Sequence, residues 1–361
     1  MPRRRSMHRL LDGGVRSMRR WPVVAASYVG AVVGAGFGSG REIAHFFALH
    51  GTAGLAGTLL AGAFFTWCGA VVLRRAATDG HRHYGDLLQG ICGPRLGPAM
   101  DGLMTVFLFL TVATVLAGAG ALTGAWGGAR WQGAVGLGIA LLGTAVWGQR
   151  GHLAVNAVLV PLLSALTLWA CGRVLVAQGL HALLRIPPWS TPPPGGWPLA
   201  AVLYVAYNLV LALAGMCASL GVDTEPADAA RGGLAGGLVL SFLCVALCAS
   251  LLGMGAEALR LELPLRAAFP GPGLGAPLFF LCLAAALWTT GSAAISALSL
   301  RLPCHPPLFT AAAGLALALP LGMAGLVWLV AVVYPLMGYA GLPLLVCMVV
   351  AAMRSRRPPA T

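Results

Sequence analysis

The sequence is poor in charge and contains no lysine. Its 361 residues include 23 arginines and 10 acidic residues, and charged residues make up only 9% of the chain. About a quarter of the residues of an ordinary soluble domain are charged, so this composition excludes that class. Hydrophobic residues make up 58% and the mean hydropathy is +0.84. The composition therefore indicates a polytopic membrane protein.

Several motifs that mark enzymes and metal sites are also missing. The nine cysteines form no C-x-x-C pair and lie mostly inside apolar runs, where they predict small buried hydrophobes without a disulfide or metal framework. No H-E-x-x-H, G-x-S-x-G or G-x-G-x-x-G pattern occurs, and no acidic pair lies inside an apolar run. We therefore expect no catalytic residues, no enzyme activity and no cofactor.

Apolar runs divide the chain into about ten predicted spans. With the N-terminus inside, seventeen arginines fall on the inner side and five on the outer side. This bias predicts two cytoplasmic termini in the inner (plasma) membrane, and it assigns the arginines to topology, with no nucleic-acid partner. The predicted ranges are 22–49, 54–73, 98–124, 133–148, 152–172, 198–221, 232–255, 276–300, 306–321 and 324–352.

The first span is interrupted by glycine. From Pro22 to His50 a continuous helix would be about 43 Å long at ~1.5 Å per residue, longer than the ~30 Å hydrocarbon core. Ser39 and Glu42 have the spacing of a capping box, which predicts that a new half-helix begins near Gly40. The alternative is that the glycines form packing faces for neighbouring helices, and both interpretations can hold. The five glycines are Gly30, Gly34, Gly36, Gly38 and Gly40.

The first and sixth spans begin alike, which suggests an internal repeat. Trp21-Pro22 and Trp197-Pro198 each precede a matching Ala, Tyr and Val at a constant offset of 176 residues. A proline-rich segment precedes the second copy, with five spans before it and five after it. Halves with an odd number of spans are inverted in the membrane, as in many secondary transporters. The predicted parts are a tail (1–20), a first five-helix repeat (21–178), a linker (179–196), a second five-helix repeat (197–353) and a basic tail (354–361).

These residues resemble a known family. The stretch Val33 to Glu42, followed by Phe46-Phe47, is similar to the first helix of the YkvI-like bacterial membrane proteins. The segments Tyr204 to Leu209, Thr289-Thr290-Gly291 and Tyr334 to Tyr339 are similar to that family too. More distantly, the chain resembles the leucine-transporter or amino acid-polyamine-organocation fold. That resemblance implies an all-α membrane protein of two inverted five-helix repeats, in which helices 1 and 6 are discontinuous.

The break predicts a binding site for a small solute. Unpaired N–H groups at the start of a half-helix suit a carboxylate or another anion, and Tyr207 and Asn208 lie near mid-depth of the sixth span. Their alternative role is interhelical hydrogen bonding. Arg41 and Glu42 are candidates for a gate at the outer end of the first span, or simply for capping and snorkelling. The predicted solute-binding residues are Gly34, Ala35, Gly36, Phe37, Gly38, Ser39, Tyr207 and Asn208.

The resemblance further implies that Thr289 and Thr290 could hold a sodium ion with carbonyl oxygens of the first helix. Hydroxyls in membrane helices more often bond their own backbone, so this alternative stays open. The sequence favours a sodium- or proton-coupled secondary transporter of a small polar or zwitterionic solute, such as an amino acid. A non-transporting membrane sensor or receptor subunit of the same fold is the alternative. Neither the solute nor the oligomeric state follows from the sequence.

Overall fold

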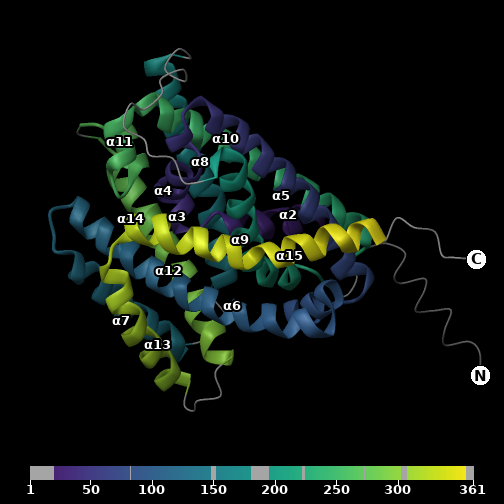
Figure 1. The fold of residues 1–361 in the computed structure, drawn as a ribbon. Helices are drawn as coiled ribbons and strands as arrows, with labels where there is room; N and C mark the ends of the chain where they lie inside the picture. Colours follow the sequence, from purple (N-terminus) through teal and green to yellow (C-terminus); the bar gives the residue numbers. More distant parts are fainter. Residues whose placement is uncertain are drawn as a thin grey trace, which may run out of the picture.

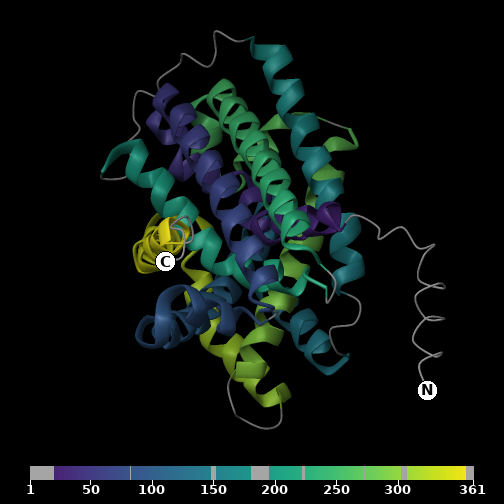
Figure 2. The ribbon, with the colours of Figure 1, turned by 90° about the vertical axis from the view of Figure 1, so that its right-hand side faces the viewer.

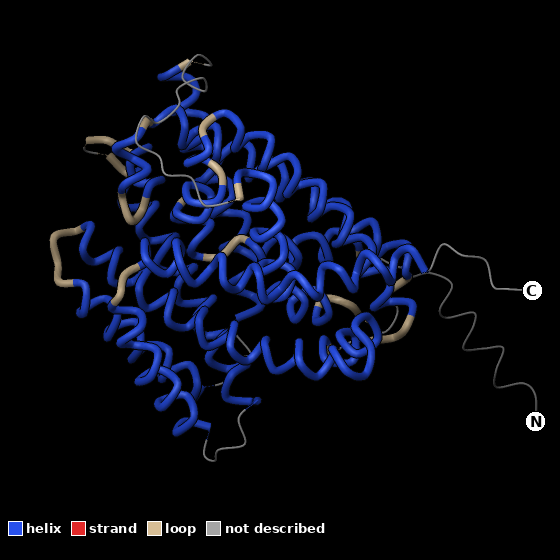
Figure 3. The backbone as a smooth tube through the Cα atoms, in the orientation of Figure 1, coloured by secondary structure: helices blue, strands red, loops and turns tan. Residues whose placement is uncertain are grey.

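The computed structural model describes residues 20–81, 83–147, 152–179, 195–221, 224–271, 273–301 and 307–354, and every regular element in this part of the chain is a helix (Figures 1 and 3). The elements of the first half are α2 (Trp21–Val32), α3 (Ala35–Ser39), α4 (Arg41–Phe46), η2 (Ala48–His50), α5 (Thr52–Thr78), α6 (Tyr84–Ala125), α7 (Arg130–Trp147) and α8 (His152–Gln178). Those of the second half are α9 (Gly196–Ala218), α10 (Pro226–Met254), α11 (Ala256–Arg260), η5 (Pro264–Ala268), α12 (Gly275–Arg301), α13 (Pro307–Met323), α14 (Leu326–Trp328), η6 (Leu329–Val333) and α15 (Tyr334–Arg354).

Many of these helices are long and apolar enough to cross a bilayer. Within the described residues, seven helical segments meet that requirement, and α2 and Leu308–Met323 are shorter apolar helices. Each predicted span overlaps one of the helices or, for the first span, a series of short ones. The prediction of an all-α, multi-pass membrane protein is therefore confirmed. The predicted tails and linker fall mainly on residues 1–19, 180–194 and 355–361, which lie outside the described residues.

The two halves are joined along a long helix pair. Helix α5 of the first half packs along α10 of the second half, side by side in Figure 2. Glycines make this approach close, because a Cβ atom on Gly233 would overlap the backbone at Gly69, and one on Gly237 would overlap the backbone at Thr66. The numbers rise along one helix as they fall along the other, so the two helices are antiparallel.

The first span and α9 also run antiparallel and touch. Tyr204, near the start of α9, packs on Phe46 and Phe47, with ring centroids 5.4 and 5.1 Å apart. Further along α9, a Cβ atom on Gly215 would lie 3.1 Å from Cβ of Ala31. In addition, α2 packs on α10 while α9 packs on α5. These exchanged, antiparallel contacts are what a pair of inverted repeats requires.

The sixth span differs from the expectation. Helix α9 is one continuous α-helix over Gly196–Ala218, so the prediction that helix 6 is discontinuous is wrong. The physical reason is local: no glycine or proline lies between Pro198 and Gly215, so nothing there weakens the helix as glycine does in the first span. Only the first span is interrupted in the way that the resemblance implied for both.

Two further segments bend. In α6, Gly93 has a positive φ of 79°, and the chain bends there between a short helix that begins at Tyr84 and the long helix that follows. Residues 74–97, which lie between two predicted spans, are therefore largely helical. In the last span, the π-helical turn η6 joins α14 to α15, and the run Leu326–Met353 forms one apolar segment. This agrees with the prediction of one span over 324–352.

Candidate functional site

The first span is broken at Gly34. Helix α2 ends at Val32, and Gly34 has an extended backbone (φ −99°, ψ −164°) before α3 begins at Ala35. The Gly34 N–H donates to the Val32 carbonyl at 2.9 Å in place of an i−4 bond. The first-turn N–H groups of a helix have no acceptor within it, and here that first turn lies inside an apolar span. Helical hydrogen bonding therefore lapses at Gly34, and the predicted interruption of the first span is confirmed.

A second break follows at Gly40. Its left-handed conformation (φ 80°) separates α3 from α4, and a Cβ atom there would lie 3.3 Å from the Leu265 backbone nitrogen. Both the positive φ and the close approach favour glycine. The Ser39 hydroxyl donates to the Gly36 carbonyl at 2.8 Å and accepts from the Arg41 N–H at 3.2 Å. Serine therefore stabilises the start of α4 as predicted, although the N-cap residue itself is Gly40.

The other half of the predicted capping box does not form. The Glu42 side chain is turned away from the Ser39 backbone, and its Oε2 accepts a hydrogen bond from the Tyr207 hydroxyl at 2.7 Å. A Cβ atom on Gly36 would overlap the Glu42 carboxylate and lie 2.7 Å from its carboxyl carbon. Glu42 thus fills the space that glycine leaves at Gly36. Capping by Glu42 is wrong because its carboxylate accepts from the buried Tyr207 hydroxyl instead of from a backbone N–H at the helix end.

Aromatic rings surround this carboxylate contact. The ring of Tyr207 lies 4.9 Å from that of Tyr334, 5.6 Å from that of Tyr204 and 5.8 Å from that of Phe46, measured between centroids. All four side chains are buried. Glu42 itself is only 6% exposed, so the acidic group lies inside the protein and not at its surface.

Arg41 points to a different part of the molecule. Its Nη1 donates to the carbonyl oxygens of Leu259 at 2.7 Å and Leu261 at 3.2 Å, at the end of α11. Helix α11 lies at the end of the bundle opposite to the C-terminal end of α15 (Figure 1). Arg41 therefore ties the broken span to the end of α11, and its role as a gate residue stays a prediction. Glu42, the other gate candidate, is on the same helical turn but faces the protein interior, where it contacts Tyr207 of α9.

The remaining predicted residues divide into two groups. Thr290 lies at the break, since a Cβ atom on Gly34 would be 3.6 Å from its hydroxyl oxygen. Thr289 instead donates to the Ala286 carbonyl at 3.2 Å, and Asn208 donates to the Tyr204 carbonyl at 2.9 Å, each within its own helix. The hydroxyl of Thr289 thus takes the backbone alternative. A sodium site stays a prediction, with Thr290 the better placed of the two threonines.

Some of the glycines serve packing, as the alternative interpretation proposed. Cβ atoms on Gly30 and Gly38 would each lie 3.1 Å from side chains of α8, Val160 and Leu163 respectively. Gly36 and Gly34 do not face α8 in this way, because their neighbours are Glu42 and Thr290. Packing and the break therefore use different glycines of the same stretch.

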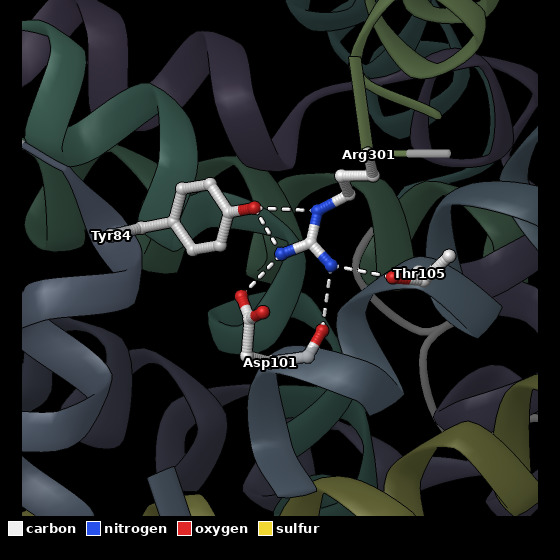
Figure 4. Close-up of polar contacts among 4 residues, drawn as sticks. All are labelled: Tyr84, Asp101, Thr105 and Arg301. Carbon is white, nitrogen blue, oxygen red and sulfur yellow. Dashed lines mark hydrogen bonds and ion pairs between the residues drawn. The ribbon is translucent and has the colours of Figure 1, made fainter. Parts of the chain in front are cut away.

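A second polar cluster, which sequence reasoning missed, lies where α12 ends (Figure 4). Arg301 donates from Nε to the Tyr84 hydroxyl at 2.6 Å and from Nη1 to the Asp101 carbonyl at 2.7 Å. Its guanidinium also contacts the Asp101 carboxylate and the Thr105 hydroxyl. Asp101 falls near the start of the predicted span 98–124, but it lies within α6 and pairs with Arg301. The cluster ties α12 to α6 through one side chain.

Two proteins of Bacillus subtilis are similar to the chain in sequence. No family model matches the chain. The chain is 28% identical over 337 residues to the uncharacterized protein YyaD of Bacillus subtilis, covering 91% of this chain and 96% of that protein. It is 30% identical over 224 residues to the uncharacterized membrane protein YkvI of the same organism, covering 61% and 63%. The resemblance to YkvI-like membrane proteins is therefore confirmed.

One solved structure shows the same architecture. The inward-facing conformation of Mhp1, a transporter of the leucine-transporter fold, superimposes with a TM-score of 0.59 at 14% identity, over 89% of this chain and 73% of that chain. A variant of the manganese transporter of Eremococcus coleocola gives a TM-score of 0.48 at 18% identity, over 92% and 72%. The match to Mhp1 shows that the chain has a leucine-transporter-like fold.

Proposed function

We propose that the protein is a secondary transporter of a small polar or zwitterionic solute, such as an amino acid, and that the solute binds at the break beside Gly34. The observation that carries the proposal is the break itself. Backbone that leaves the helix at membrane depth is tolerated only where it is buried in protein or lines a polar cavity. Gly34 is partly exposed although its neighbours Val33 and Ala35 are buried, so the break has open space on one side.

The groups around Gly34 suit a solute with hydrogen-bonding ends. The first-turn N–H groups of α3 are donors, and the hydroxyl of Thr290 can donate or accept. The Glu42 carboxylate occupies the space beside Gly36, so the room left for a solute is beside Gly34 and α12. The fold shared with Mhp1 supports transport, since in such folds the binding site lies between the repeats near the midplane.

The proposal includes a location and an orientation. The protein lies in the inner (plasma) membrane with both termini in the cytoplasm, because the arginine-rich segments are predicted on that side. Arg41 and the α11 segment then lie at the outer end and Arg301 at the inner end. Solute access from outside requires the contacts between Arg41 and the carbonyl oxygens of Leu259 and Leu261 to open.

Ligand-induced thermal stabilisation of the purified full-length protein tests binding. A panel of amino acids with and without sodium is compared for the wild type, Gly34→Leu and Gly102→Leu. Gly102 is the matched control, because a Cβ atom there meets nothing within 4 Å. We expect one or a few amino acids to raise the unfolding temperature of the wild type and Gly102→Leu but not of Gly34→Leu. Equal stabilisation of all three would place the site elsewhere.

Uptake into proteoliposomes then separates a transporter from a sensor. The amino acid found by thermal stabilisation is supplied outside, with a sodium or a pH gradient imposed across the vesicle membrane. Accumulation that depends on one of these gradients supports secondary transport. Tight binding without uptake under either gradient would contradict the proposal and favour the sensor or receptor alternative.

A further inference from the structure

The carboxylate of Glu42 lies inside the protein, and the part of the chain that the structure describes gives it no counter-charge. It is 6% exposed, and the Tyr207 hydroxyl provides its hydrogen bond. Among the described residues, no arginine or histidine nitrogen lies within ion-pair distance of it, although such pairs occur elsewhere, as between Arg130 and Glu262 at 3.0 Å. An isolated ionised carboxylate in an apolar environment costs so much free energy that it is neutralised by a proton or a cation.

The groups that face Glu42 from neighbouring elements do not supply that neutralising charge. On its own helix, Arg41 is directed to the carbonyl oxygens of α11, and the buried Nε2 of His45 has no hydrogen-bond partner. In the described ranges, the other packed elements contribute hydroxyls and a thiol within electrostatic range of the carboxylate. These are Tyr204 and Tyr207 on α9, Cys244 on α10 and Tyr334 on α15.

The space around the carboxylate limits what can neutralise it. One side is taken by Gly36, whose missing Cβ atom leaves just enough room for the carboxylate itself. The other side holds the packed rings of Tyr207, Tyr204 and Phe46. A metal ion would need several oxygen ligands, and only the Tyr207 hydroxyl bonds the carboxylate. A proton needs no such room.

We propose that Glu42 is a proton-binding site and that its protonation couples the proton to the movement of the two halves. A hydronium ion of the solvent gives up the proton, so that one of its O–H bonds breaks and water is left. One O–H bond forms at a carboxylate oxygen, and the negative charge of the carboxylate is lost. A hydrogen bond to an ionised acceptor is roughly twice as strong as one between neutral groups. Protonation therefore weakens the bond from Tyr207 on α9 to Glu42 on α4, which joins the first half to the second. The coupling part of this inference rests on the proposed transport function.

Infrared difference spectroscopy of the full-length protein in lipid nanodiscs tests the site with the proton as its probe. Spectra at acidic and alkaline pH are subtracted for the wild type, Glu42→Gln, Glu257→Gln and Tyr207→Phe. We expect a carboxylic acid C=O band, at the frequency typical of an apolar environment, that the wild type and Glu257→Gln share and Glu42→Gln lacks. The side chain of Glu257 is 87% exposed, which makes it the matched control. Tyr207→Phe should shift the frequency of the band, because its hydrogen-bond donor is gone.

Two results would overturn the inference. If the band persists in Glu42→Gln, another carboxyl group titrates. If sodium at constant pH removes the band, Glu42 binds a metal cation in place of a proton. Glutamine has nearly the same shape as glutamic acid and can still accept from Tyr207, so an unchanged unfolding temperature of Glu42→Gln shows that the fold is intact.

The outcome is separable from that of the proposed function. The infrared measurement needs no solute, so Glu42 can titrate as proposed even if no amino acid binds. Conversely, if an amino acid is taken up, the same vesicles are tested with an imposed pH gradient. We expect Glu42→Gln to bind the amino acid, but its uptake driven by the pH gradient should be at least ten-fold slower than that of the wild type. Uptake by the variant at the wild-type rate would contradict the coupling role.

Discussion

Tyr207 on α9 donates a 2.7 Å hydrogen bond to Glu42 on α4, across a sequence separation of 165 residues. Tyr207 is 1% exposed and Glu42 is 6% exposed, so neither group has water as an alternative partner. The bond connects the broken first span to the continuous sixth span, and hence one half of the chain to the other. Its loss leaves a buried carboxylate with no donor.

Removal of this donor should destabilise the protein. We expect Tyr207→Phe to lower the free energy of unfolding by about 1–3 kcal/mol, the range for a buried acceptor left unsatisfied. Tyr339→Phe is the control, since Tyr339 is 46% exposed on α15 and should change stability by less than about 0.5 kcal/mol. Unfolding of each variant at increasing concentrations of a denaturing detergent measures its free energy of unfolding. Equal stability of the two variants would mean that the Glu42 contact contributes nothing.

The sequence predicts the break well and its partners poorly. Glycine density and the length of the first apolar run are local properties, and they correctly indicate that the first span is interrupted. The Ser39–Glu42 spacing is also local, but it identifies only the serine correctly. The fate of Glu42 depends on Tyr207, which only the tertiary fold brings near, so no pattern within a few residues of Glu42 could reveal it.

The sixth span shows the converse error. The resemblance to a family with two broken helices implied a break in α9, yet its own residues from Leu199 to Ala214 contain no glycine or proline. Local helix propensity was the better guide there. Arg301 was counted only for topology, because its partners Tyr84 and Asp101 are about 200 residues away in sequence.

Arg301 should hold α12 and α6 together. Replacement by alanine removes the donor of several hydrogen bonds and leaves the Asp101 carboxylate without its pair. We expect Arg301→Ala to cost about 1–3 kcal/mol of stability and to speed amide hydrogen exchange at the start of α6. Arg231→Ala is the control, because Arg231 is 62% exposed and pairs with Asp228 within its own helix. Unchanged exchange near Tyr84 in Arg301→Ala would show that the cluster does not fasten the two helices.

Topology can be tested directly. Reporter fusions after residue 354 and within 74–83 should report the cytoplasm, whereas fusions near Arg130 and Arg266 should report the outside. The reason is the arginine bias, which places seventeen arginines on one side and five on the other. An external C-terminus would contradict the orientation and remove the assignment of Arg41 to the outer end.

Gly36 provides the sharpest test of the site, because the absence of a side chain there leaves the space that the Glu42 carboxylate occupies. A methyl group at Gly36 would overlap that carboxylate and force it away from Tyr207. Gly36→Ala gains up to about 1 kcal/mol of helix propensity but loses the buried hydrogen bond between Tyr207 and Glu42, so we expect a net loss of about 1–2 kcal/mol. Gly172→Ala in α8, where a Cβ atom meets nothing within 4 Å, should be neutral or stabilising.

A double-mutant cycle identifies the cause of that loss. If Gly36→Ala acts by displacing Glu42 from Tyr207, it should cost little in a Tyr207→Phe background, since the bond is already absent there. Additive effects of the two substitutions would mean that Gly36 is needed for packing alone. Gly36→Leu, which adds still more bulk beside Glu42, should in addition abolish amino acid binding in a folded preparation. Normal binding by folded Gly36→Leu would show that the solute site lies away from this break.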